Sequence, residues 1–123
     1  MAKFKSFEEI ISWQKARELN KLIYEITNKN PNFSRDFGLR DQIRKSSISI
    51  SSNIAEGFER ETTKEFIRFL FIAKASAGEF RSQLYLAFDL AYIESENFED
   101  LKNRVNEVSK TISGLIKYLS STL

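Results

Sequence analysis

Apolar residues recur at helical spacing along almost the whole 123-residue chain and divide it into four segments. The first begins with a capping-box pattern, Ser6 and Glu9, and ends near Pro31, the only proline. The second runs from about Gly38 to Gly57, and we expect Gly57 to end it in a left-handed conformation. No alternating strand pattern competes with these helices, so the sequence predicts an all-α protein.

The last two segments carry the most regular stripes. The third begins at Thr62, where Thr62 and Glu65 form another capping box, and is expected to reach about Tyr92. The fourth begins near Ser95, and its apolar positions alternate steps of three and four residues as far as Leu119. Four long helices with short connections favour an antiparallel up-down-up-down four-helix bundle, formed as a single domain over residues 1–123.

The second helix has an unusual composition, because residues 42–57 combine an apolar stripe with five serines and one asparagine. Serine and asparagine are weak helix formers, but small hydroxyl side chains let two backbones approach closely. We therefore expect this helix to be packed on more than one side, with Ile48 on a second buried side. We expect polar side chains to hold the second and third helices together, with Glu79 paired to Arg44 or Arg81 and Glu56 bonded to Asn53. The predicted network consists of Arg44, Ser49, Asn53, Glu56 and Glu79.

The chain has more large apolar side chains than one bundle can bury, including 11 phenylalanines. A four-helix monomer needs one apolar stripe per helix, and several residues lie beside the stripes. They are Trp13, Ile48, Phe69, Phe71, Tyr85, Phe88 and Tyr92. Exposed apolar patches of this kind usually mark partner surfaces, so we predict a homo-oligomer.

Composition argues against an enzyme, because the chain contains no histidine and no cysteine. Ser-His-Asp and Cys-His catalytic groups, disulfides and thiolate metal sites are therefore excluded. The four glycines are far apart, so there is no glycine-rich phosphate loop. We expect no catalytic residue, cofactor or metal. No apolar run approaches 18 residues and the first residues lack a secretory signal, which predicts a cytoplasmic protein that makes no membrane contact.

The formal net charge is only +2, with a pI of about 8.9. Basic residues nevertheless gather around the second helix and the start of the third, and a ring of subunits would repeat them around an axis. Ordinary surface charge is the alternative interpretation. The candidate nucleic-acid-binding residues are Arg35, Arg40, Arg44, Lys45, Arg60, Lys64 and Arg68.

Three stretches resemble one known family. Residues 49–57, Ser-Ile-Ser-Ser-Asn-Ile-Ala-Glu-Gly, are similar to the Ser-Ile-x-x-Asn-Ile-Ala-Glu-Gly signature of the 23S rRNA intervening-sequence proteins. Residues 7–16, with Trp13-Gln14-Lys15-Ala16, resemble the opening of that family, and residues 66–79 resemble its third helix. The resemblance covers nearly the whole chain.

The resemblance implies an antiparallel four-helix bundle that assembles into ring-like homopentamers. The family takes its name from reading frames inside insertions in 23S rRNA genes, which does not establish a ribosomal role. A related group, the accessory proteins of diversity-generating retroelements, shares the bundle and the pentamer, is basic, and engages a reverse transcriptase and nucleic acid. No catalytic residue is carried over from either group.

These observations predict a non-enzymatic oligomeric scaffold or interaction protein that binds RNA or a nucleoprotein partner through a basic surface. The alternative is a protein–protein scaffold with no nucleic-acid role. Binding to RNA would weaken with rising salt, whereas a protein partner would tolerate salt. An enzyme would instead require a pocket of convergent polar groups with perturbed pKa values.

Overall fold

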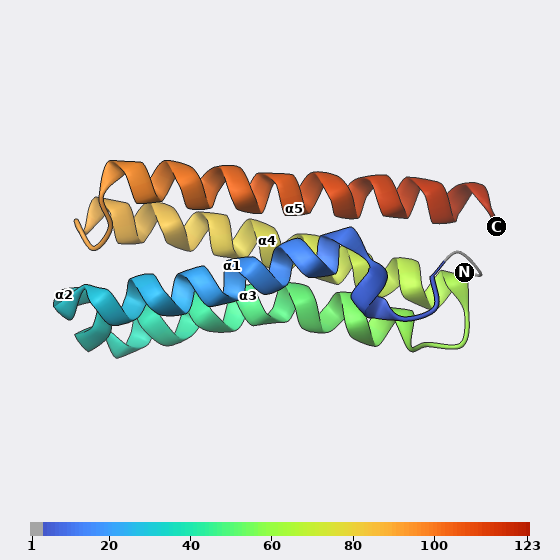
Figure 1. Ribbon diagram of the computed structural model, residues 1–123, viewed down its shortest axis with the longest axis horizontal. Coiled ribbons are helices and arrows are strands. Elements are labelled where there is room, and N and C mark those ends of the chain that lie inside the picture. Colours follow the sequence, from blue (N-terminus) through green and yellow to red (C-terminus); the bar gives the residue numbers. More distant parts are fainter. Residues whose placement is uncertain (1–3) are drawn as a thin grey trace.

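The computed structural model describes residues 4–123, and this part of the chain contains five α-helices and one 3₁₀ helix with no strand. Four long helices lie side by side and run alternately in opposite directions (Figure 1). They are α1 (Ile11–Lys29), α3 (Phe37–Phe58), α4 (Thr63–Asp89) and α5 (Ser95–Ser121). The arrangement is compatible with the predicted four-helix bundle. The all-helical class is confirmed.

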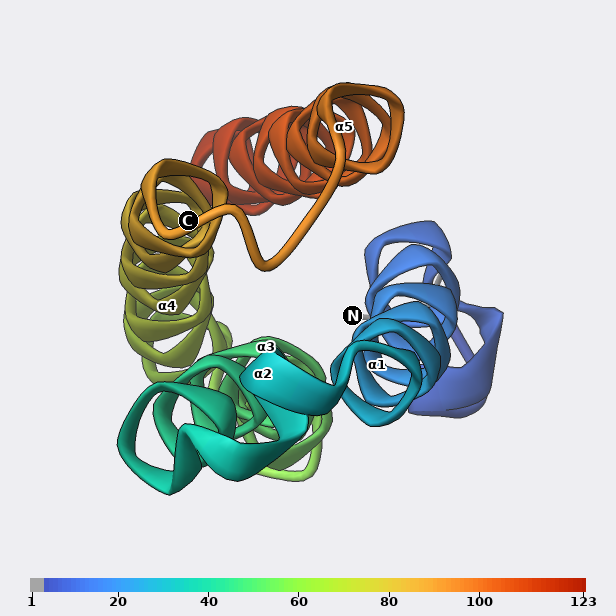
Figure 2. The same ribbon diagram turned by 90° about the vertical axis from the view of Figure 1, so that its left-hand side faces the viewer.

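The four helices surround one apolar core, as the end-on view shows (Figure 2). The stripes predicted from sequence supply it: Phe66, Leu70 and Phe80 of α4 are fully buried, as are Leu19 of α1 and Ile50 of α3. Burying each of these side chains contributes roughly 1.5–3 kcal/mol. In α5 the last turns bury Ile116 more deeply than the predicted Leu115.

The N-terminal capping box does not form. A 3₁₀ turn, η1 (Phe7–Glu9), precedes α1, and the Ser6 side chain makes no capping hydrogen bond. Ile10 is extended and buried, and Phe7 packs edge-on against Trp13 with ring centroids 5.1 Å apart. Because Ile10 takes an extended conformation, α1 begins only at Ile11.

A short helix, α2 (Pro31–Arg35), fills the break between the first two long helices and was not predicted. The Asn30 side chain accepts hydrogen bonds from the amides of Asn32 and Phe33, at 2.9 and 3.0 Å, and caps it. Asp36 then caps α3 by accepting from the Leu39 amide at 3.1 Å. Two polar caps six residues apart therefore turn the chain around the fully buried Phe33.

The C-terminal ends of α3 and α4 also differ from expectation, whereas the start of α4 does not. Gly57 lies inside α3 and not in a left-handed cap, since no glycine of the chain has a positive φ. Thr62 caps α4 as predicted, accepting from the Glu65 amide at 3.1 Å. However, α4 ends at Asp89, and Ala91 takes the left-handed conformation with φ 61°.

None of the helices in residues 4–123 is both long and apolar enough to cross a membrane.

Candidate interaction surfaces

The serine-rich run of α3 lies between two neighbouring helices and bonds to both. On the α4 side, Ser46 Oγ donates to Gln83 Oε1 at 2.7 Å, and the hydroxyls of Ser49 and Ser76 share a bond of 2.9 Å. On the α1 side, one amide side chain serves two serines: Asn20 accepts from Ser47 at 2.7 Å and donates to Ser51 at 3.0 Å. The expected packing on more than one side is therefore present, with hydroxyl–amide bonds between the helices.

The predicted polar network is only partly brought together. Asn53 Nδ2 donates to the carbonyl and the hydroxyl of Ser49, at 2.8 and 3.0 Å. Arg44 faces α1 instead of Glu79: it donates to Thr27 and Asn28 at 2.9 Å each.

The two carboxylates of that network lie apart from their expected partners. Glu79 accepts from Gln83 of its own helix at 3.3 Å, and Arg81 turns toward α5. Glu56 is exposed, and within residues 4–123 its side chain makes no hydrogen bond or ion pair. Helix rotation decides this for Arg44, which lies on the side of α3 that faces α1 and not α4.

The predicted nucleic-acid residues separate into two groups at opposite ends of α3. Arg35, Arg40, Arg44 and Lys45 lie near its start, and Arg60, Lys64 and Arg68 lie beyond its end. Between Arg44 and Arg60 the helical rise alone amounts to about 24 Å.

Several of these cations are already engaged by neighbouring groups. Arg40 pairs with Asp41 at 3.0 Å, and Arg68 pairs with Glu65 at 2.9 Å. The bond from Arg68 lowers the pKa of the Glu65 carboxyl, which also lies 4.0 Å from Arg60. Both arginines additionally stack over Phe69 at 4.8 Å. These contacts reduce the positive charge that each group can offer to a ligand.

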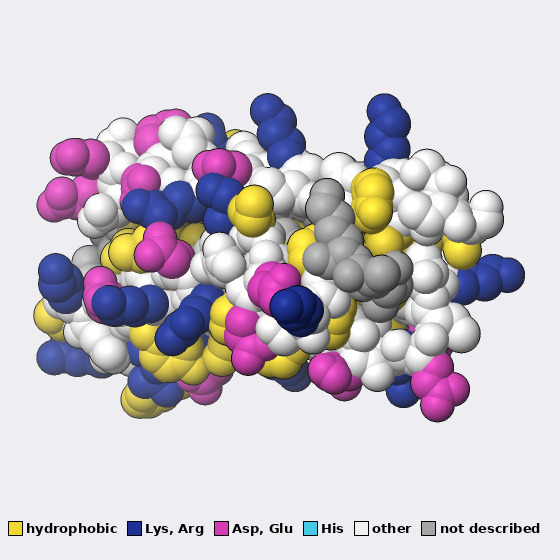
Figure 3. Space-filling model, turned by 45° about the vertical axis from the view of Figure 1, so that its right-hand side comes forward, with side chains coloured by type: hydrophobic (Ala, Val, Ile, Leu, Met, Phe, Trp, Pro, Cys, Tyr) yellow, Lys and Arg dark blue, Asp and Glu magenta, His cyan; other side chains and the backbone are white. Residues whose placement is uncertain are grey.

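Apolar side chains reach the surface in several places, as one face of the molecule shows (Figure 3). The most continuous set lies on α4 on the side opposite the core, and Phe71 is 55% exposed and Leu86 48%. We call the following residues the α4 outer face: Phe71, Ile72, Ala75, Gly78, Ser82 and Leu86, all of them exposed.

Some other members of the predicted apolar excess are partly or fully covered within the chain itself, and others stay exposed. Phe69 is buried, and Trp13 and Tyr92 are half-buried. Phe88 stacks on Phe98 with ring centroids 4.5 Å apart, although it keeps 37% exposure. Ile48, expected on a second buried side of α3, is instead 39% exposed, because it lies away from α4 and the core.

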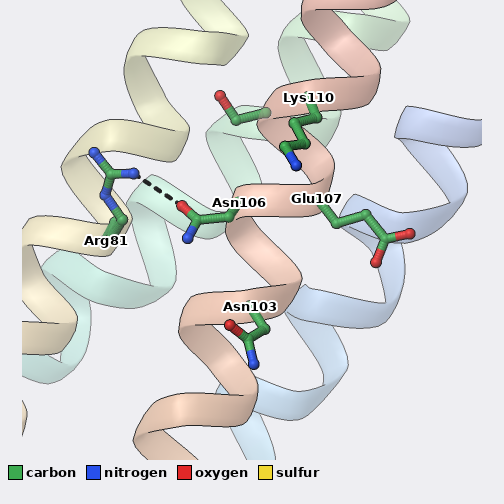
Figure 4. A pocket seen from close by; sticks show the side chains of 6 residues that line it. Arg81, Asn103, Asn106, Glu107 and Lys110 are labelled. Carbon is green, nitrogen blue, oxygen red and sulfur yellow. Dashed lines mark hydrogen bonds between the residues drawn. The ribbon is translucent and has the colours of Figure 1, made fainter.

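A polar cleft of about 770 Å³ runs along α5 beside α4. Arg81 reaches across from α4 and donates to Asn106 Oδ1 at 2.8 Å, while Asn103 and Lys110 project from α5 (Figure 4). Glu107 points away from Arg81 toward α1 in this view, where it pairs with Lys15 at 2.8 Å. That hydrogen bond lowers the pKa of the Glu107 carboxyl below its usual value.

We call this site the α4–α5 cleft; Arg81, Asn103, Asn106, Glu107, Ser109 and Lys110 line it. Sequence reasoning did not select it as a site. The i, i+3, i+7 spacing of Asn103, Asn106 and Lys110 on one helix side is the signal that could have indicated it. Arg81 has no such signal, because only the register of α4 against α5 places it there.

No group of three or more Asp or Glu side chains suited to a metal ion occurs in the described part of the chain. The apolar α4 outer face and the polar α4–α5 cleft are the candidate interaction surfaces. Such surfaces can bind a macromolecule through burial of apolar area and through hydrogen bonds and charge.

Comparison with known proteins adds a family and a fold. The structure is similar to the crystal structure of a protein of unknown function from the S23 ribosomal protein family of Bacteroides thetaiotaomicron, with a TM-score of 0.81 and 29% identity. That alignment covers 87% of this chain and 99% of the other. No curated protein is similar enough to count as a relative. The model of the 23S rRNA-intervening sequence proteins matches residues 8–114, so this chain belongs to the 23S rRNA-intervening sequence protein family.

Proposed function

We propose that this protein is a non-enzymatic interaction protein: an antiparallel four-helix bundle that assembles with copies of itself and binds RNA or a nucleoprotein partner through a basic surface. The observation that carries the proposal is the α4 outer face. Phe71, Ile72 and Leu86 are exposed on one side of one helix, and the small residues Ala75, Gly78 and Ser82 and the exposed Glu79 lie among them. Removing apolar area of this kind from water contributes a favourable free energy of about 25 cal/mol for each Å² that a partner covers.

A second copy of the chain is the occupant that we propose for this face. Gly78 supports close approach of another backbone, because an added Cβ would meet nothing within 4 Å in the single chain. A glycine inside a helix costs up to about 1 kcal/mol relative to alanine, and no contact within the described chain explains it. Identical copies related by rotation would form a closed ring, and the family resemblance suggests a homopentamer.

The absence of histidine and cysteine from the whole sequence favours the non-enzymatic assignment. The pKa directions point the same way. Shifts occur at Glu65, Arg68, Tyr92 and Glu107, and each has a hydrogen bond to one neighbouring side chain as its largest cause. Structural ion pairs and side-chain hydrogen bonds explain such shifts without any catalytic role.

A protein–protein scaffold without a nucleic-acid role is the second candidate function. It is favoured by the engagement of Arg40, Arg60 and Arg68 by Asp41 and Glu65, which reduces the charge offered by the predicted basic set. Capture of a protein partner that survives high salt, with no retention of RNA at low salt, would favour this function over the first.

Sedimentation velocity at micromolar concentration tests the assembly. The wild-type protein should sediment as a multiple of its 14.3 kDa chain, and Phe71→Glu combined with Leu86→Glu should return it to the single chain. Phe37→Glu is the matched control, since Phe37 is 63% exposed but lies at the start of α3. A wild-type protein that sediments as a folded single chain would overturn the self-assembly.

A further inference from the structure

The α4–α5 cleft offers hydrogen-bond donors that the fold itself does not use. Arg81 commits one N–H to Asn106, which orients the guanidinium and leaves the rest of its donors unengaged. Because Asn106 Oδ1 accepts that bond, the amide nitrogen remains available to donate. Asn103 and Lys110 make no side-chain hydrogen bond or salt bridge within residues 4–123.

Charge in the cleft favours an anion. Arg81 and Lys110 carry two positive charges, and no carboxylate lies within salt-bridge distance of either in the described chain. The one acidic residue in the lining, Glu107, is paired with Lys15 of α1, and Lys110 also interacts with it electrostatically. Lys102, next to the cleft on α5, is paired with Glu99 at 3.4 Å and is therefore not counted.

The shape of the cleft favours a linear anion over a small one. Its α5 side extends from Asn103 to Lys110, a rise of about 10 Å. Successive phosphates of one strand in a duplex are spaced by about 3.4 Å along the axis and lie further apart in an extended single strand, so the cleft is long enough for at least two of them. Arginine and asparagine side chains bind phosphate oxygens by charge-assisted and neutral hydrogen bonds, respectively.

We propose that the α4–α5 cleft binds the phosphodiester backbone of a nucleic acid, with Arg81 and Lys110 as the charged contacts and Asn103 and Asn106 as neutral donors. The inference rests on the nucleic-acid part of the proposed function and specifies its site. It moves the contact away from the basic residues around α3, several of which are already paired.

The residues required for binding also predict how it depends on salt. Each phosphate contact to a single strand contributes about 0.7 to the slope of log affinity against log salt. Removing Arg81 and Lys110 should therefore reduce the magnitude of that slope by about 1.4 and weaken binding about tenfold at moderate salt. Asn106→Ala leaves the net charge unchanged but releases the Arg81 guanidinium, so it should also weaken binding.

Fluorescence anisotropy of the full chain with labelled oligouridylate and oligothymidylate of about 20 nucleotides, between about 50 and 200 mM KCl, measures these effects. The variants are Arg81→Gln with Lys110→Gln, and Asn106→Ala. Lys21→Gln with Lys29→Gln is the matched control, because it removes two positive charges from exposed side chains of α1 that lie outside both the cleft and the predicted basic set. The RNA and DNA arms distinguish which nucleic acid supplies the backbone, and circular dichroism confirms that each variant is folded.

Selective weakening by both cleft variants, with the control within about twofold of wild type, is the expected result. Equal losses in the cleft variant and the control, or wild-type affinity for Asn106→Ala, would overturn the cleft assignment while RNA binding stands. If wild-type protein binds neither strand at the lowest salt, both the nucleic-acid function and the cleft assignment are overturned. The sedimentation result for the α4 outer face is independent of all three outcomes.

Discussion

Gly57 is a point of close approach between α3 and α4, and Gly57→Ala is the substitution that tests this packing. A Cβ at position 57 would lie 2.6 Å from the Cβ of Phe69, 3.0 Å from Cδ1 of Phe66 and 3.3 Å from the Phe66 carbonyl oxygen. The first contact is with an atom fixed to the α4 backbone, so no rotation of a side chain can relieve it. The helices would have to separate by roughly 1 Å, since ordinary contacts begin near 3.4 Å.

The expected cost follows from two opposing contributions. Alanine is a better helix former than glycine by up to about 1 kcal/mol, which favours the variant. Forcing additional atoms into a well-packed interior costs about 1–3 kcal/mol, and this site requires movement of backbone. We therefore expect a net loss of about 1–2 kcal/mol in the free energy of unfolding. For 123 residues this corresponds to a fall of roughly 4–8 °C in Tm.

Gly114→Ala is the matched control, because Gly114 lies inside α5 and an added Cβ there would meet nothing within 4 Å. It should raise the stability by up to about 1 kcal/mol through helix propensity alone. Urea unfolding followed by circular dichroism at one fixed protein concentration measures both variants. If Gly57→Ala is as stable as Gly114→Ala, the close approach of the two helices does not constrain residue 57, and the explanation is wrong.

Three further substitutions test local features of the fold. Ala91→Gly should raise Tm by a few degrees, because the left-handed residue that ends α4 carries a Cβ penalty of about 1–2 kcal/mol, partly offset by the freer unfolded chain; an unchanged or lower Tm would contradict it. Tyr92→Phe should remove a loss of stability that the wild-type protein shows at high pH. The hydrogen bond to Asp36 raises the pKa of the Tyr92 hydroxyl above its usual value of 10.0. The stabilising effect of this bond is therefore complete below pH 10 and disappears as the pH rises through the higher folded-state pKa. Stability curves of wild type and Tyr92→Phe that coincide up to pH 12 would refute this. Asn53→Leu should lower Tm or alter the oligomer size, because it removes the two bonds to Ser49; unchanged values of both would count against the polar network.

Periodicity predicted the long helices well because every one of them buries a regular stripe. The stripe of α4 from Phe66 to Ala87 lies in the core as expected. Helix ends were less predictable. Ala91 is a poor residue for a left-handed position, yet the Tyr92 amide reaches the Ala87 carbonyl at 2.9 Å and the Ala91 amide reaches Phe88 at 2.9 Å. These two bonds form a Schellman motif without its usual glycine, so composition gave no indication of the end.

The polar residues show why sites were harder to predict than helices. The sequence predicts that Glu79 pairs with Arg44 or Arg81, but Arg44 lies on the α1 side of α3 and stacks over Tyr24 at 4.3 Å. Arg81 and Asn106 are 25 positions apart, and only the register of α4 against α5 brings them to 2.8 Å. Packing of the whole core sets the rotation of each helix and its register against its neighbours, and no local sequence pattern indicates either.

The two proposed surfaces share α4, which carries the outer face and contributes Arg81 to the cleft, and this arrangement couples them. Phe71 and Leu86 face away from the core, whereas Arg81 faces α5, so assembly through the outer face leaves the cleft of each subunit open. A ring would then present several clefts to one strand, and each additional contact would become intramolecular. Phe71→Glu with Leu86→Glu should therefore weaken binding to a long RNA by more than about tenfold, but binding to an oligonucleotide that fills one cleft by much less. Equal losses on long and short RNA in anisotropy titrations would show that the clefts act independently of assembly.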